Sequence, residues 1–105
     1  MKRKNPLVTI YITNHNYGRF IEQSIKSVLS QTLKNFEVII IDDGSKDNSK
    51  KIISKYSKLN NITVIFQKQK GLAISNNIAL NIAKGKYIMR LDADDYLDSY
   101  AIQLM

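Results

Sequence analysis

The stretch from Phe36 to Ile41 is apolar at nearly every position and ends in two adjacent aspartates, Asp42 and Asp43. A strand with one face in water alternates apolar and polar residues. A strand inside a parallel sheet is covered on both faces and is apolar throughout. The stretch is typical of the second kind. The sequence therefore predicts a central strand of a parallel sheet, with helices on both sides of it.

Strand-like and helix-like patterns alternate along the rest of the chain. Apart from 36–41, strands are predicted over 7–12, 62–66 and 87–91, and helices over 21–29, 48–56, 74–83 and 96–105. Gly85 follows the third helix where a C-terminal glycine stop is expected. Repeated strand–helix–strand units imply right-handed crossovers. We expect an α/β three-layer sandwich with a mostly parallel sheet of roughly four strands and four helices, formed by residues 1–105 as a single domain.

Composition excludes several classes of protein. The chain has 105 residues and no cysteine, so disulfide frameworks and thiolate chemistry are excluded. The longest aliphatic stretch runs from Val38 to Ile41, far short of the ~20 residues of a membrane span. The basic residues after Met1 precede a strand-like pattern, which argues against a signal peptide. We expect no transmembrane segment and a location in the cytoplasm, either free or at the inner face of the membrane.

The acidic residues are concentrated although the chain is basic. The net charge is +7, yet seven of the nine acidic residues fall in two clusters that follow predicted strands: Asp42, Asp43 and Asp47, then Asp92, Asp94, Asp95 and Asp98. A basic chain with concentrated acid fits two kinds of partner, a polyanion, or a metal together with an anionic substrate. Ligands of parallel α/β sheets bind beyond the carboxyl ends of the strands. The polar loops 13–18, 42–48 and 92–95 should therefore share one rim.

The carboxylates of Asp92, Asp94 and Asp95 have two interpretations. They form either a solvated turn that caps the next helix or a divalent-cation site. Their place on a rim with Asp43 and His15 favours the cation, because a metal between carboxylates and a diphosphate neutralises both. Residues two apart in an extended segment point the same way, so Asp92 and Asp94 aim at one region.

Five segments of the chain, in order from Pro6 to about Leu97, resemble the family 2 glycosyltransferases of GT-A fold. These segments are 8–16, 27–32, 36–45 and 83–88, followed by Leu91-Asp92-Ala93-Asp94-Asp95. The resemblance implies transfer of a sugar from a nucleotide-diphospho-sugar donor, with inversion and with a divalent cation, Mn²⁺ or Mg²⁺. It also implies a UDP-sugar donor, a saccharide or lipid-linked acceptor, and a role in cell-surface polysaccharide biosynthesis.

The resemblance assigns roles by position. Thr13 and His15 match first-loop residues that hold the base, and Asp43 matches the aspartate that hydrogen-bonds it. Asp92 and Asp94 match the Asp-x-Asp motif. Asp94 is the expected principal metal ligand, and Asp92 is expected near the ribose and the metal.

Two residues depart from the family pattern. His15 stands where a tyrosine is usual, so a histidine ring replaces a tyrosine ring for stacking. Ser75 stands where the family often has an arginine, so a cation near the donor is missing there. The candidates to replace that cation are Lys68, Lys70 and Arg90.

The resemblance also implies that the acceptor-binding half, with the Asp or Glu that deprotonates the acceptor, lies downstream of the Asp-x-Asp motif. No residue of this chain matches that base by position, so no catalytic residue is assigned. We expect the chain to be the donor-binding half of a transferase, truncated before the acceptor half, and to bind better than it catalyses. Such a fragment leaves an edge strand and an apolar face exposed, so we expect a dimer or larger homo-oligomer.

Three alternatives stay open at this point. A nucleic-acid-binding module would explain the charge, although the acidic residues sit where the ligand should bind and the sequence has no known nucleic-acid motif, so we expect no nucleic acid. A receiver-type signalling domain would need its acidic pair after the first strand, where this chain has Thr13 to Asn16. A non-catalytic module that binds a nucleotide or polyanion as the partner of another chain is the third.

Overall fold

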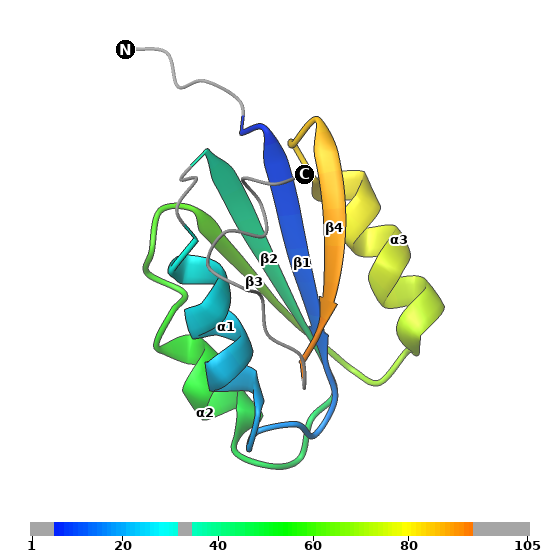
Figure 1. Cartoon of the computed structure of the whole chain (residues 1–105). Coiled ribbons are helices and arrows are strands. Elements are labelled where there is room, and N and C mark those ends of the chain that lie inside the picture. Colours follow the sequence, from blue (N-terminus) through cyan, green and yellow to red (C-terminus); the bar gives the residue numbers. More distant parts are fainter. Residues whose placement is uncertain (1–5, 32–34, 94–105) are drawn as a thin grey trace.

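The computed structural model describes residues 6–31 and 35–93. The elements follow in the order β1 (Val8–Asn14), α1 (Ile21–Leu29), β2 (Phe36–Asp43), α2 (Ser49–Ser54), β3 (Ile62–Gln67), α3 (Leu72–Ile82) and β4 (Tyr87–Asp92). The four strands form one sheet in the order β3-β2-β1-β4, and every neighbouring pair is parallel (Figure 1). This confirms the predicted α/β fold. The helix predicted over 96–105 lies outside the described residues.

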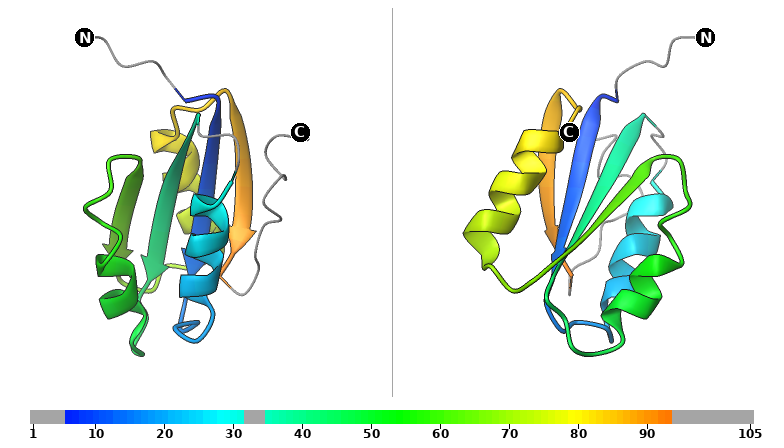
Figure 2. Two further views of the ribbon diagram at one scale, coloured as in Figure 1. Left: turned by 60° about the vertical axis from the view of Figure 1, so that its left-hand side comes forward. Right: turned by 180° about the vertical axis from the view of Figure 1, so that it is seen from behind.

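The sheet is the middle of three layers, with α1 and α2 on one face and α3 on the other (Figure 2). Successive side chains of a strand point to opposite faces, so β2 contributes to both interfaces. Val38 and Ile40 lie in the core beneath α1 and α2, whereas Ile39 and Ile41 pack with Ala79 of α3. All four β2 residues are at most 1% exposed, as the continuous apolar run predicted.

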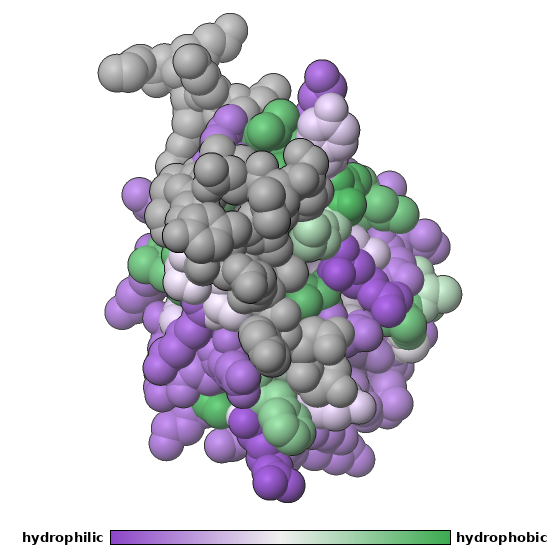
Figure 3. All heavy atoms as spheres, viewed as in Figure 1, coloured by the Kyte–Doolittle hydropathy of each residue, from purple (hydrophilic) through white to green (hydrophobic). Residues whose placement is uncertain are grey.

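The side of the sheet covered by α3 has a smaller buried core than the side covered by α1 and α2. Figure 3 shows mainly hydrophilic residues over α1 and α2, whereas hydrophobic residues gather towards β4 and α3. Six large apolar side chains of these two elements are exposed, namely Leu72, Ile74, Leu80, Ile82, Tyr87 and Ile88. The buried core is accordingly larger on the α1 and α2 side.

The carboxyl ends of β1, β2 and β4 lie level with one another. Asn14 of β1 is opposite Asp42 of β2, and Thr13 is opposite Asp92 of β4. The loops that leave the ends of β1, β2 and β3 gather at the lower edge of the sheet in Figure 1. The prediction that the polar loops share one rim is therefore confirmed for the residues up to 93.

Gly85 does not end α3 in the way the sequence suggested. The helix stops at Ile82, and Ala83 follows in an extended conformation, with φ −64° and ψ 134°. The glycines with positive φ in the described chain are Gly44 and Gly71. A Cβ at Gly85 would lie 2.5 Å from the backbone nitrogen of Thr9, and the Gly85 N–H donates to Thr9 Oγ1 at 2.8 Å. Gly85 is thus required because the start of β4 approaches β1 closely.

The close approach at Gly85 predicts a stability defect for Gly85→Ala. The added methyl group meets backbone atoms, which cannot rotate away, so we expect a loss of about 1–3 kcal/mol. For a domain of this size, this corresponds to a fall in melting temperature of at least about 4 °C, measured by circular dichroism. Lys84→Ala is the matched control, because the hydrogen bond that Lys84 gives to Glu37 comes from its backbone N–H. If the melting temperature of Gly85→Ala were no lower than that of Lys84→Ala, the close approach would not be the reason for the glycine.

Candidate functional site

A cleft of about 460 Å³ opens at the carboxyl rim of the sheet, next to the first turn of α3. It is lined by Thr13, Asn14, His15, Tyr17, Asp43, Gln69, Gly71, Leu72, Ser75, Arg90, Asp92 and Ala93. Four of the five residues predicted to bind a nucleotide-sugar are among them, namely Thr13, His15, Asp43 and Asp92. The fifth, Asp94, lies outside the described residues. Residues from β1, β2 and β4 thus meet in one cavity.

The two aspartates that end β2 point to opposite faces of the sheet and have different surroundings. Asp42 follows the residues that face α1 and α2, and it is completely buried. Its carboxylate accepts hydrogen bonds from Asn14 Nδ2 at 2.8 Å and from Ser45 Oγ at 2.6 Å, and from the Ser45 N–H at 3.1 Å. Asp42 therefore joins the end of β1 to the loop after β2, and it does not line the cleft.

Asp43 faces α3 and lines the cleft, and its carboxylate holds the loop between β3 and α3. Oδ1 accepts from the Lys70 N–H at 2.7 Å and from Gln67 Nε2 at 2.9 Å, and Oδ2 accepts from the Gly71 N–H at 3.0 Å. Burial alone would raise the pKa of Asp43. The hydrogen bonds from Lys70, Gln67 and Gly71 and the nearby His15 outweigh burial and lower this pKa below its usual value. Asp43 is thus a stable carboxylate with limited capacity for a further donor.

The ring of His15 is fixed by the backbone of β2. Its Nδ1 lies 2.6 Å from the carbonyl oxygen of Asp43, and since a carbonyl only accepts, Nδ1 carries the hydrogen. Asn16 Nδ2 lies 3.3 Å from Nε2. The half-buried ring therefore forms a wall of the cleft in one orientation.

Asn14 contributes an amide that is only partly satisfied. The residue is 1% exposed, and Nδ2 donates to Asp42 and also to Ser45 Oγ at 3.1 Å. Its Oδ1 is buried and has no hydrogen-bond partner in the described structure. A buried acceptor without a donor is costly. The amide is bonded to Asp42, which faces α1 and α2, so Oδ1 is not offered to a ligand on the Asp43 side of the sheet.

Asp92 stands at the end of β4, paired with Arg90 on the same side of the strand. Arg90 Nη2 lies 3.3 Å from Asp92 Oδ1, and the two side chains are 38% and 46% exposed. The end of the strand is held by Ser24 of α1, whose hydroxyl donates to the Ala93 carbonyl at 2.7 Å. The strand end is therefore fixed by α1, and the carboxylate of Asp92 remains accessible.

The residues present fit a cation that is completed by a ligand. Among residues 6–31 and 35–93 no group of three or more His, Cys, Asp or Glu side chains could hold a metal ion. Asp92 is the accessible carboxylate, and one or two carboxylates together with substrate phosphates are the common binding mode of Mg²⁺. The donor set of the cleft thus suits a hard cation shared with a phosphorylated ligand. The predicted second carboxylate, Asp94, lies outside the described residues.

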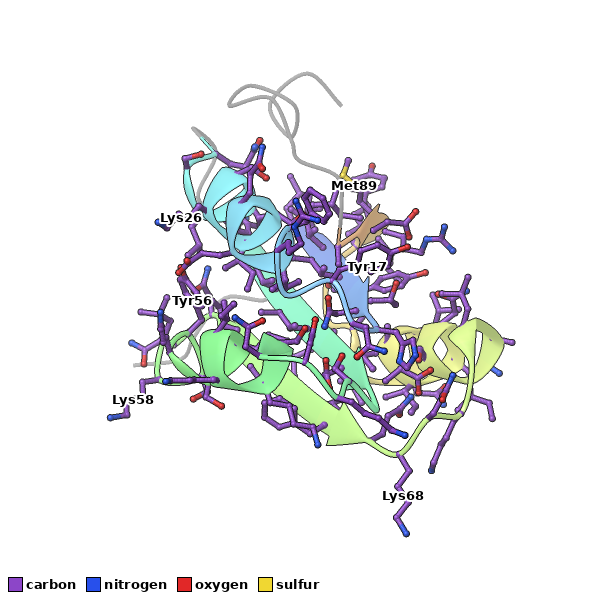
Figure 4. All side chains as sticks on the ribbon, turned by 90° about the horizontal axis from the view of Figure 1, so that it is seen from below. Tyr17, Lys26, Tyr56, Lys58, Lys68 and Met89 are labelled. Carbon is purple, nitrogen blue, oxygen red and sulfur yellow. The ribbon has the colours of Figure 1, made fainter. Side chains whose placement is uncertain are left out.

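Structure also places residues that the sequence did not assign. Tyr17 lines the cleft and is 44% exposed, and its position within the polar loop two residues after His15 was the available signal. Of the three candidate cations, Arg90 lines the cleft, whereas Lys68 and Lys70 do not. Figure 4 shows Lys68 extending outward from the loop after β3, and Tyr17 at the carboxyl end of β1. The alternation of side chains along a strand would have placed Arg90 beside Asp92.

Comparison with known proteins decides the family. The model of "Glycosyl transferase family 2" matches residues 9–105 of the chain. The chain belongs to glycosyl transferase family 2. The family 2 chain is 38% identical to a chondroitin synthase of Escherichia coli over 103 residues, which is 97% of this chain and 15% of that protein. It is 46% identical over 90 residues to the E. coli UDP-Glc:alpha-D-GlcNAc-diphosphoundecaprenol beta-1,3-glucosyltransferase WfaP, which is 86% of this chain and 36% of that protein.

Solved structures show the same fold. S. aureus TarS 1–349 in complex with UDP-GlcNAc superposes with a TM-score of 0.85 and 26% identity, covering 92% of the family 2 chain and 29% of TarS. A mannosyltransferase of Pyrobaculum calidifontis, solved with GDP-Man and Mn²⁺, gives a TM-score of 0.79 at 23% identity, over 89% and 29% of the two chains, which shows the fold alone. The predicted GT-A fold is confirmed. The family 2 chain spans well under half the length of each of these relatives.

No helix in the described part of this family 2 chain is long and apolar enough to cross a membrane.

The contacts of Asp43 predict a loss of stability in Asp43→Asn. An asparagine turns part of the acceptor into an N–H donor that faces other donors, so we expect a loss of about 1–3 kcal/mol at neutral pH, measured by urea denaturation. Because the folded pKa is lowered, the contribution of Asp43 is present above the unfolded value of about 3.9 and is lost as the pH falls through the folded pKa. The difference in the free energy of unfolding between wild type and variant should therefore become smaller as the pH is lowered. A gap that stays constant from pH 7 to about pH 2 would refute this role.

Proposed function

We propose that this chain binds the nucleotide-diphospho-sugar donor of a family 2 glycosyltransferase and forms the donor-binding half of that enzyme. The observation that carries the proposal is the cleft. Thr13, His15, Asp43 and Asp92 line one cavity although they lie at or directly after the ends of three different strands. Family membership supplies the reaction, which is transfer of a sugar from the nucleotide to an acceptor hydroxyl.

The base and ribose would bind on the side of the cleft formed by β1 and β2. Asp43 keeps part of its acceptor capacity, because a carboxylate has about four lone-pair positions and three donors occupy it here. The fixed ring of His15 and the exposed ring of Tyr17 offer stacking surfaces. A pyrimidine N–H suits the carboxylate of Asp43, so we propose a uridine nucleotide, in line with the UDP-GlcNAc bound to TarS.

The diphosphate would lie towards the end of β4. Asp92 and Asp94 would hold a divalent cation, Mn²⁺ or Mg²⁺, together with the phosphate oxygens. When bound, the cation would neutralise the charge that develops on the leaving diphosphate. The first turn of α3 also borders the cleft through Gly71 and Leu72, and its N–H groups have no side-chain cap. Helix N-termini favour negative charge nearby.

The acidic residues described in the cleft are poorly suited to act as the general base. Asp43 accepts three hydrogen bonds, which lower its pKa and weaken it as a base. Asp92 is paired with Arg90 and is assigned to the metal and the ribose. We therefore propose that the residue that deprotonates the acceptor, and the acceptor site itself, belong to a part of the enzyme outside this chain. Inversion at the anomeric carbon then follows from a single displacement by that activated hydroxyl.

Three further expectations stay predictions. The acceptor is expected to be a saccharide or a lipid-linked sugar in cell-surface polysaccharide synthesis, as the names of the chondroitin synthase and of WfaP suggest. The location in the cytoplasm or at the inner face of the membrane rests on the sequence. A dimer or larger assembly would be refuted by a monomer mass in light scattering over a wide range of concentrations.

Calorimetric titration with UDP in the presence and absence of Mn²⁺ tests the donor and metal assignments. We expect wild type to bind UDP more tightly with Mn²⁺, and Asp94→Ala and Asp92→Asn to lose this gain, by about tenfold or more, since tenfold corresponds to about 1.4 kcal/mol. Glu22→Gln is the matched control, because Glu22 accepts a hydrogen bond from Tyr56 OH, and the amide keeps an acceptor. Binding that is independent of metal and unchanged in both aspartate variants would reject the metal site. Absence of UDP binding to wild type would reject the proposed function.

A further inference from the structure

We propose that Arg90 binds the phosphates of the donor, exchanging its contact with Asp92 for one with phosphate oxygens. This inference rests on the proposed function, because it assigns a residue to the diphosphate part of the same cleft. It concerns the side chain that brings positive charge to the phosphates, a role that neither the metal ligands nor the base-binding residues fill.

The charged side chains described in the cleft offer an anion one positive partner, Arg90. Asp43 and Asp92 bring two carboxylates to its wall. Arg90 is the single Lys or Arg side chain among the described residues that line it. The chain carries sixteen Lys and Arg residues, so this one is distinguished by its position and not by a general excess of charge.

The position of Arg90 follows from strand geometry. It is opposite Tyr11 of β1, which packs in the apolar cluster beneath α3, and Asp92 is opposite Thr13 on the same side. Both β4 side chains therefore face the layer of α3. Ser75 of α3 lines the same cleft and is buried, with its hydroxyl bonded within its own helix and to Gln67. The small Ser75 side chain brings no charge to this wall, so the positive charge comes from β4.

The contact between Arg90 and Asp92 is weak enough to be exchanged. The two groups are 3.3 Å apart and more than a third exposed, and exposed ion pairs contribute little to stability. A planar guanidinium matches two phosphate oxygens at once, and such bidentate contacts are among the stronger hydrogen bonds. With a cation held by Asp92, Arg90 would no longer be needed to balance the charge of that carboxylate. Arg90 would then be available to phosphate oxygens in the same cleft.

The other nearby cations do not offer the same contact. Lys68 extends away from the ribbon (Figure 4). Lys70 contributes its backbone N–H to Asp43, and its side chain does not line the cleft. Neutralising Lys68 therefore changes the net charge of the chain as much as neutralising Arg90 does, but it leaves the residues of the cleft unchanged.

The test compares UDP with uridine as ligands of wild type, Arg90→Gln, Arg90→Lys and the control Lys68→Gln, by calorimetry in the presence of Mn²⁺. We expect Arg90→Gln to weaken UDP binding by about 10- to 100-fold, the range for a charge-assisted contact, and to leave uridine binding unchanged. Arg90→Lys should recover part of the loss, because a single ammonium keeps the charge without the bidentate geometry. Lys68→Gln should bind both ligands as wild type does. Circular dichroism melts of each variant establish that it is folded.

The outcomes separate this inference from the proposed function. If wild type binds UDP and Arg90→Gln keeps the same ratio of UDP to uridine affinity, Arg90 does not bind phosphate, and the proposed function stands. If Arg90→Gln loses UDP and uridine equally, Arg90 acts on the shape of the cleft and the inference is overturned. If wild type binds neither ligand, the proposed function fails and this role fails with it.

Discussion

The arrangement of the rim depends on the alternation of side chains at the end of β2. Two adjacent carboxylates on one extended strand must point to opposite faces of the sheet. Asp42 therefore binds the end of β1 and the loop after β2, and Asp43 binds the N–H groups of the loop that leads into α3. Because each carboxylate is satisfied by its own loop, two negative charges coexist at neighbouring positions. The cleft lies on the side that Asp43 faces.

The three aspartates of the first acidic cluster, Asp42, Asp43 and Asp47, have different roles. Asp47 accepts the Gly18 N–H at 2.8 Å and the Ser49 N–H at 2.9 Å, so it joins the loop after β1 to the start of α2. A Cβ at Gly18 would lie 2.1 Å from Asn48 Oδ1, so a larger residue there would require the Asn48 side chain to move. Asp47, like Asp42, maintains the shape of the rim. Of the three acidic residues, Asp43 alone reaches the cleft.

The sequence predicted much of this because parallel sheets impose strict rules. The apolar run of 36–41 and the helical spacing after it determined the layers, and the rule that ligands bind at carboxyl ends located the cleft. The prediction that Gly85 ends the helix was wrong, because the sequence does not distinguish a glycine that takes a positive φ from one that allows two strands to approach closely. It could not reveal that the loop at 70–71 returns to Asp43, since backbone N–H groups carry no residue signature.

That return has a consequence for how such a chain can diversify. Asp43 holds the loop at Lys70 and Gly71 by main-chain nitrogen atoms, which every residue except proline possesses. The side chains at 68–70 therefore do not hold the loop in place, and all three residues are exposed. Gln69 among them lines the cleft. Substitutions at this position can thus change which groups line the cleft while the backbone keeps its position. New ligand preferences can therefore arise with little loss of folding stability.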